Sequence, residues 1–218
     1  SPNKYSQNIT LCTNHAEIRV TKSSSSTAAG IIAYMADDSA DQAHTVTYCT
    51  NFGSVTNDSG YAGGIIGHLD SDSVKHKVTD NRNEGEIGCA NGIAGGIVGY
   101  SEGGGNFTKN TNTNKVSGKV AGGIMGQNED DSINFSNCKN SRGDVRAVSY
   151  AGGILGYTGS RDNDKAFTFD GCSNSGYVYS DTSYAGGIAG VIASDNLNHS
   201  FINCTNENSV TGHISTGG

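Results

Sequence analysis

A short phrase, Ala-Gly-Gly-Ile-x-Gly, recurs along almost the whole chain and limits the folds that are open to it. Its isoleucine occurs six times at spacings of 27 to 34 residues, with a degenerate first copy, at Ile31, Ile65, Ile97, Ile124, Ile154 and Ile188. A period of this size is the signature of repeat architectures, in which each small unit is stable only when it stacks on its neighbours. We therefore treat residues 1–218 as a single repetitive domain.

A second phrase precedes each copy of the first. Its fullest forms are Phe169-x-x-Cys172-x-Asn174-x-Gly176-x-Val178 and the equivalent stretch from Val46 to Val55. Its asparagine is present in all seven copies, at Asn14, Asn51, Asn83, Asn112, Asn140, Asn174 and Asn206. Its cysteine is replaced by Asn81 and Asn110 in two copies and is otherwise present, at Cys12, Cys49, Cys138, Cys172 and Cys204.

Both phrases are typical of strands rather than helices. They are short, punctuated by glycine and rich in Ile, Val and Phe, and the whole chain contains 32 glycines and one proline. A strand pair of this size cannot bury its apolar face alone, so equivalent strands of successive repeats should stack in parallel at about 4.8 Å. A propeller blade needs four strands, and most of these units are too short to supply them.

The sequence thus predicts an all-β fold, a right-handed parallel β-helix (solenoid) of about seven coils. The repeat isoleucines should form one inward column, and the adjacent glycines should let opposing walls approach closely. The asparagines should stack and hydrogen-bond from coil to coil. We interpret them, for that reason, as structural residues and not as a binding site.

The two phrases together resemble the GLUG motif, a short glycine-rich repeat of bacterial surface and secreted proteins, among them adhesin-like proteins and some immunoglobulin-cleaving peptidases. The resemblance rests on Gly64-Ile65-Ile66-Gly67 and its counterparts with their flanking alanines, and the repeating unit covers nearly the whole chain. It implies an extracellular or bacterial cell-surface location and carries no catalytic residues. Ala29 and Ala33 depart from the pattern, which indicates a first coil near an end or a boundary.

The last copy of the repeat stops in mid-phrase at Thr216-Gly217-Gly218. We therefore expect the natural polypeptide to be longer than this segment. Terminal coils without a cap expose unpaired N–H and C=O groups, so the isolated segment should associate end to end.

The cysteine pattern favours free thiols. Six cysteines in an exported protein would ordinarily indicate disulfides, but five of them occupy one core-facing position that asparagine also fills. Stacked side chains that point in the same direction give poor disulfide geometry. We therefore expect buried thiols that behave as small apolar side chains, with Cys89 alone outside the column.

Acidic residues gather in the segments of variable length that separate the phrases, at Asp70, Asp72, Glu129, Asp130, Asp131, Asp162 and Asp164. Carboxylates on loops along one edge of the solenoid are candidate ligands for a hard cation such as calcium. Their spacing matches neither an EF-hand nor the nonapeptide calcium repeat, and loops that keep the rod soluble explain them more simply. We therefore expect no obligatory cofactor.

Tyrosines flank the glycine phrase on both sides, before it at Tyr61, Tyr150 and Tyr184 and after it at Tyr34, Tyr100 and Tyr157. Two aromatic rows of this kind can form a flat face for sugars. The alternative, which we favour, is that the rings cap the ends of the core strands and keep their hydroxyls in water.

Arg142-Gly143-Asp144 is a further candidate for ligand display, since this tripeptide is familiar as an integrin ligand. The copy of the repeat that contains it has one extra residue between Asn140 and Val145, which a bulge or turn would display. Three-residue matches also arise by chance.

The sequence offers little that points to catalysis. Its acids lie in loops of changing length, its six histidines share no repeat position, and neither H-E-x-x-H nor G-x-S-x-G occurs. The net charge of −7, with Lys and Arg scattered singly, argues against a nucleic-acid partner. No apolar run approaches the roughly 18 residues of a membrane span.

We therefore expect a non-enzymatic adhesion or ligand-display module of a bacterial surface or secreted protein, with a host or cell-surface glycan or protein as its partner. Two alternatives stay open. One is a carbohydrate-binding or polysaccharide-processing β-helix, and the other is a structural spacer for a different domain, such as a peptidase.

Overall fold

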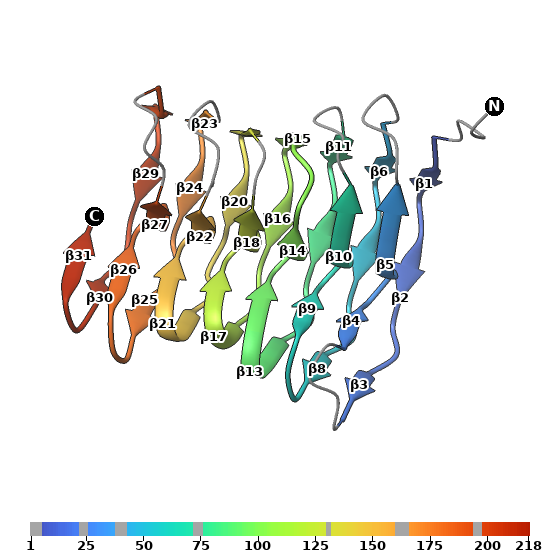
Figure 1. Ribbon diagram of the computed structural model, residues 1–218, viewed down its shortest axis with the longest axis horizontal. Helices are drawn as coiled ribbons and strands as arrows, with labels where there is room; N and C mark the ends of the chain where they lie inside the picture. Colours follow the sequence, from blue (N-terminus) through green and yellow to red (C-terminus); the bar gives the residue numbers. More distant parts are fainter. Residues whose placement is uncertain are drawn as a thin grey trace.

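The computed structural model describes residues 6–21, 26–37, 43–71, 76–129, 132–159, 166–193 and 198–218. Within these ranges the chain forms strands and turns and no helix. The described residues therefore contain no helix long and apolar enough to cross a membrane. Figure 1 shows the turns following one another along the long axis in sequence order. The prediction of a parallel β-solenoid is confirmed.

Each turn of the solenoid visits four sheets in the same order. Sheet 1 consists of β1 (Asn8–Thr10), β6 (Thr45–Thr47), β11 (His76–Thr79), β15 (Gly105–Thr108), β19 (Ile133–Ser136), β23 (Phe167–Asp170) and β28 (Ser200–Ile202). Sheet 2 consists of β2 (Thr13–Asn14), β7 (Thr50–Asn51), β12 (Arg82–Asn83), β16 (Thr111–Asn112), β20 (Lys139–Asn140), β24 (Ser173–Asn174) and β29 (Thr205–Asn206).

Sheets 3 and 4 complete the turn. Sheet 3 consists of β3 (Ile18–Val20), β4 (Thr27–Ala29), β8 (Val55–Asn57), β9 (Tyr61–Gly63), β13 (Ile87–Gly95), β17 (Val116–Gly122), β21 (Val145–Gly152), β25 (Val178–Ser180), β26 (Tyr184–Gly186), β30 (Val210–Thr211) and β31 (Ser215–Gly217). Sheet 4 consists of β5 (Ile32–Asp37), β10 (Ile66–Ser71), β14 (Val98–Ser101), β18 (Met125–Glu129), β22 (Leu155–Gly159) and β27 (Ala189–Ala193).

The expected number of about seven coils is slightly too high. About five turns have a neighbour on both sides, and an edge turn at each end extends sheets 1 and 2 to seven strands. The last edge turn adds no described strand to sheet 4.

The repeat isoleucines form the predicted inward column. The peptide N–H of each isoleucine from Ile65 to Ile154 donates to the carbonyl of the next one at 2.8–3.0 Å. Their side chains are fully buried, and Ile188 at the end of the column is half-buried. In the same core the Phe107, Phe135 and Phe169 rings of sheet 1 pack from turn to turn, with centroids 5.0–5.5 Å apart. The large apolar side chains of both phrases thus fill a single hydrophobic core.

The asparagines of sheet 2 form a continuous hydrogen-bonded ladder across all seven strands of that sheet. Each Nδ2 donates to the Oδ1 of the next turn at 2.7–2.8 Å, from Asn14 to Asn206. Each Nδ2 also donates to a carbonyl two or three residues further along its own turn, as Asn51 does to Gly53 at 2.7 Å. The ladder therefore closes a tight corner within every turn and joins it to the next turn.

The glycine phrase packs directly against this ladder across the interior. An added Cβ on Gly123 would approach Asn140 Cγ to 2.7 Å, and Gly96 has the same relation to Asn112 and Gly153 to Asn174. The second glycine of each phrase thus leaves room for the asparagine of the following turn. This contact explains why the two phrases occur together.

The cysteines are free thiols, as the repeat pattern predicted. Cys49, Cys138 and Cys172 are buried in the main core, and the two members in the edge turns are half-buried. Asn81 replaces a cysteine without disturbing the repeat, because its Oδ1 accepts the peptide N–H of Cys49 at 2.9 Å and its Nδ2 donates to Val46 at 2.8 Å.

We predict that Gly123→Ala lowers the free energy of unfolding by about 3 kcal/mol, because the methyl group would overlap both Asn140 and the Gly153 carbonyl. Gly88→Ala is the matched control. Its new Cβ would lie 3.7 Å from Ser117 Oγ and 3.9 Å from a Thr56 methyl group, so stability should hold or rise slightly. Urea unfolding of both variants measures the difference, and an equal loss would contradict the packing described here.

Thiol titration should separate the cysteines by burial. Half-buried Cys12 and Cys204 should react with a thiol reagent in the native protein, whereas the four fully buried cysteines should react only after denaturation. Mass spectrometry of the labelled peptides identifies the sites. Protection of all six thiols after denaturation, or rapid labelling of all six in the native protein, would contradict the structure.

Stability should fall at alkaline pH partly through Cys89. Burial raises the pKa of this thiol from 9.0 to about 12, so between these values the unfolded chain releases a proton that the folded chain retains. The stabilisation is present below pH 9 and is lost as the pH rises toward 12. Relative to Cys89→Ala, the wild type should lose on the order of 1–3 kcal/mol more over this range in urea titrations. If the free energies of unfolding of the wild type and Cys89→Ala change in parallel with pH, this contribution of Cys89 is excluded.

Candidate functional site

Two columns of side chains outside the cores run side by side where sheets 3 and 4 meet. The first column consists of the residue that immediately precedes Ala-Gly in each repeat. On successive turns these residues are Tyr61, Ile93, Val120, Tyr150 and Tyr184. The second column lies three residues after each repeat isoleucine and contains Tyr34, His68, Tyr100, Gln127 and Tyr157. The parallel register therefore makes neighbours of residues that are 27 to 34 positions apart in the sequence.

A groove of about 630 Å³ opens along these columns. Tyr61 stands at one end and Tyr150 with Tyr157 at the other, while Ile93 and Val120 line the stretch between them. Polar groups also line the groove, at Asn91, Lys119, Gln127 and Ser149. The groove exists because the first column has two smaller aliphatic side chains between its tyrosines.

The tyrosine rings stack in two groups at the ends of the groove. Tyr61 lies on Tyr100 with centroids 4.3 Å apart and an interplanar angle of 6°. Tyr150 packs on Tyr157 at 5.2 Å and on Tyr184 at 6.1 Å. The predicted aromatic rows therefore merge into two clusters instead of one flat face, and Tyr100 is buried beneath Tyr61 with 5 % of its surface exposed.

The phenols stay protonated. Burial raises the pKa of Tyr61 and of Tyr157, and burial together with the hydrogen bond to Glu129 raises the pKa of Tyr100. Tyr100 donates its hydroxyl proton to Glu129 Oε2 at 2.6 Å. Tyr61 and Tyr157 thus line the groove as neutral rings that carry hydroxyl groups.

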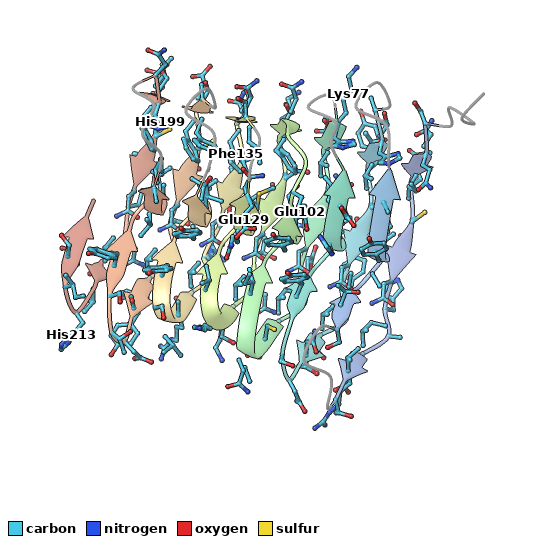
Figure 2. All side chains as sticks on the ribbon, viewed as in Figure 1. Lys77, Glu102, Glu129, Phe135, His199 and His213 are labelled. Atoms are coloured by element: carbon cyan, nitrogen blue, oxygen red, sulfur yellow. The ribbon has the colours of Figure 1, made fainter. Side chains whose placement is uncertain are left out.

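Carboxylates form a third column beside the second one. Asp70, Glu102 and Glu129 occupy the same position, five residues after the repeat isoleucine, on three successive turns. Figure 2 shows Glu102 and Glu129 on neighbouring turns near the middle of the solenoid. The expectation that the acids lie in loops of changing length is wrong for Asp70 and Glu129, which belong to strands β10 and β18.

Each of these carboxylates is hydrogen-bonded to the second column. Tyr34 donates its hydroxyl to Asp70, His68 Nε2 lies 3.2 Å from Glu102 Oε1, and Gln127 donates its amide to Glu129 at 2.8 Å. His68, Asp70 and Glu102 each offer one nitrogen or oxygen atom that lies within 4.8 Å of the corresponding atoms of the other two.

His68 and Glu102 were not predicted as site residues. Aligning the repeats on their isoleucines would have found them, since His68 and Tyr100 share one position and Glu102 shares another with Asp70 and Glu129. The other acidic residues proposed as calcium ligands lie outside the described residues, at Asp72, Asp130, Asp131, Asp162 and Asp164.

The Arg142-Gly143-Asp144 segment forms a tight corner against the neighbouring turns. Arg142 has a φ of 70° and absorbs the extra residue, so that Asn140 Nδ2 reaches the Gly143 carbonyl at 2.6 Å. Gly143 is buried, and the Asp144 carboxylate accepts the Tyr177 peptide N–H at 3.3 Å. Only the Arg142 side chain is well exposed, so the tripeptide does not project as a loop.

The histidines also differ from expectation. His44, His76 and His199 share one column, two residues before the apolar residue of the second phrase. His44 and His76 are buried and stack at 5.1 Å, with the His44 peptide N–H donating to His76 Nδ1 at 3.0 Å. The expectation that the six histidines share no repeat position is therefore wrong for these three.

A second groove of about 450 Å³ lies on sheet 3, over small residues such as Gly88, Ser117 and Ala147, and Tyr179 also lines it. Its Arg146 lies 3.8 Å from Asp144. The first groove, which we call the tyrosine groove because Tyr61, Tyr150 and Tyr157 line it, is the better candidate site. It combines aromatic walls with several amide and hydroxyl groups.

Comparison with known proteins assigns no family to this chain. No family model matches the chain, and no curated protein matches it either. A crystal structure described as a putative immunoglobulin A1 protease from Bacteroides ovatus is similar, with 18% sequence identity and a TM-score of 0.49. The match covers 87% of this chain and 78% of that one.

Proposed function

We propose that this β-solenoid is a non-enzymatic ligand-display module that binds a neutral carbohydrate in the tyrosine groove. The observation that carries the proposal is the spacing of Tyr61 and Tyr150 on either side of Ile93 and Val120 in one column. Three rungs separate the two tyrosines, which at about 4.8 Å per rung is about 14 Å. A short oligosaccharide that runs along the solenoid axis fits this length.

The chemistry of the groove supports a sugar. Faces of pyranose rings carry C–H groups that pack on aromatic rings, and a few placed polar groups fix orientation in such sites. Asn91, Gln127 and Ser149 provide amide and hydroxyl groups for sugar hydroxyls. The neutral phenols add donors that do not ionise near pH 7.

The charge of the molecule favours a neutral glycan over an acidic one. The chain has a net charge of −7, and Lys119 is the cation that lines the described groove. Polyanions would meet an unfavourable field except at that side chain.

The resemblance of the repeat to the GLUG motif supports an extracellular or cell-surface location for this module. A repeat surface that shows its groove to the outside suits adhesion to a host or neighbouring cell.

A glycan array followed by calorimetry with the best ligand tests the proposal. Tyr61→Ala and Tyr150→Ala should each weaken binding at least tenfold, which corresponds to about 1.4 kcal/mol. Tyr177→Ala is the matched control, because Tyr177 is 55 % exposed and does not line the groove. Thermal melting confirms that the variants are folded.

Two results would overturn this function. Silence of the wild type on glycans and matrix proteins favours a spacer, in which the groove has no ligand. Release of shorter oligosaccharides from a bound polysaccharide favours the polysaccharide-processing alternative, with the carboxylate column as the place to search for its acid and base.

A further inference from the structure

The cluster of His68, Asp70 and Glu102 lies behind the aromatic end of the groove and has no role in the function proposed above. His68 and Asp70 alternate with Gly67 and Leu69 on β10, so both project to the same side of the strand. Glu102 follows β14 on the next turn, where its peptide N–H donates to Leu69 at 2.9 Å. The backbone thus holds three donor side chains on two adjacent turns.

Three tyrosine rings fix the imidazole of this cluster. Tyr34, Tyr61 and Tyr100 contact His68 edge to face, with centroid distances of 5.1, 4.9 and 5.0 Å. The residue is 9 % exposed, while the Glu102 side chain is 45 % exposed. A nearly buried imidazole in one orientation, beside carboxylates that reach solvent, is a preorganised donor set with an open side.

The charge balance of the cluster is incomplete. Within the described part of the chain, neither Asp70 nor Glu102 forms an ion pair with lysine or arginine. Asp70 accepts the Tyr34 hydroxyl, and Glu102 contacts His68. Two carboxylates on adjacent turns repel each other, and a bound cation would offset that repulsion.

We infer that His68, Asp70 and Glu102 bind a divalent first-row transition metal, with zinc as the reference ion. One imidazole nitrogen and two carboxylate oxygens are three ligands of a four-coordinate zinc site, with solvent in the fourth position. Ligand atoms around a tetrahedral zinc lie about 3.4 Å apart, given bonds of about 2.0–2.2 Å. His68 Nε2 and Glu102 Oε1 are already 3.2 Å apart, and an Asp70 oxygen lies within 4.8 Å of the ligand atoms of both, so a side-chain rotation of Asp70 would complete the set.

The imidazole distinguishes this site from a calcium site. Calcium takes six to eight oxygen ligands and does not select nitrogen, whereas imidazole suits zinc, copper, iron and nickel. The same reasoning separates this site from the calcium loops considered from the sequence, of which Asp70 alone is shared.

Metal titration of the metal-free, untagged protein tests the inference. Calorimetry should give one zinc ion per chain, and calcium should bind at least tenfold more weakly. Cobalt should give visible ligand-field bands without the near-ultraviolet thiolate absorption that Cys12 or Cys204 ligation would produce. Because Tyr61 and Tyr100 contact His68 and the chain has no tryptophan, tyrosine fluorescence should change on zinc binding.

Variants assign the ligands. His68→Ala and Glu102→Gln should each weaken zinc binding at least tenfold, and Glu102→Gln keeps the side-chain shape in case His68→Ala unfolds. Glu129→Gln is the matched control, since Glu129 occupies the same column and bonds to Tyr100 and Gln127 instead. Its zinc affinity should equal that of the wild type.

Three outcomes would overturn the inference: no zinc binding at millimolar concentration, equal binding of calcium and zinc, or an affinity that Glu102→Gln leaves unchanged. The measurements use no glycan, so they succeed or fail independently of carbohydrate binding.

Discussion

The contact between the asparagine ladder and the glycine phrase supports the rest of this structure. The ladder occupies the interior next to sheet 2, where a buried amide is tolerated only if its hydrogen bonds are made. Asn112, for example, receives a bond from one turn, donates to the next and closes its own corner. Gly96 packs on it and leaves no room for a methyl group. The hydrogen-bonded asparagine amides and the glycines that pack on them therefore set the distance between the opposing sheets. The apolar side chains fill the remaining interior.

Much of this fold follows from the period alone. Two phrases that recur in a fixed order have few ways to satisfy all copies at once, and parallel stacking satisfies every copy in the same way. The inward isoleucines, the asparagine ladder and the free thiols were predictable because each is a property of one repeat position. The corners at which a non-glycine residue adopts a positive φ were not predictable in this way. Leu11, Tyr48 and Lys109 adopt φ values of 52–57° one residue before the cysteine position, where side-chain identity varies from turn to turn. The neighbouring turns override their local preference there.

The candidate site was predictable in part. The tyrosines were found because they touch the glycine phrase, but their clustering depends on which turns carry Ile93 and Val120 between them. Asp70 and Glu129 were assigned to loops because the segments around them vary in length, although the variation begins beyond their strands. His68 is an isolated histidine in the sequence. Its environment of three tyrosines exists only in the stacked register.

The groove and the metal-ligand cluster share a wall. Tyr61 lines the groove on one face and contacts His68 at 4.9 Å. Under the two proposals above, a metal on His68 would restrain the same ring on which a sugar would stack. Any coupling between two such sites would change both affinities by the same factor, as linkage requires.

The asparagine ladder also makes the solenoid polar along its axis. Backbone hydrogen bonds between turns run in both directions, since Thr50 donates to Cys12 in the preceding turn and Val55 donates to Glu86 in the following one. Their dipoles largely cancel. The side-chain amides all donate toward the C-terminal turn, so their dipoles add, as peptide dipoles do in a helix. A fold with no described helix thus acquires a directional column of aligned amides, and its two ends differ in sign as well as in sequence.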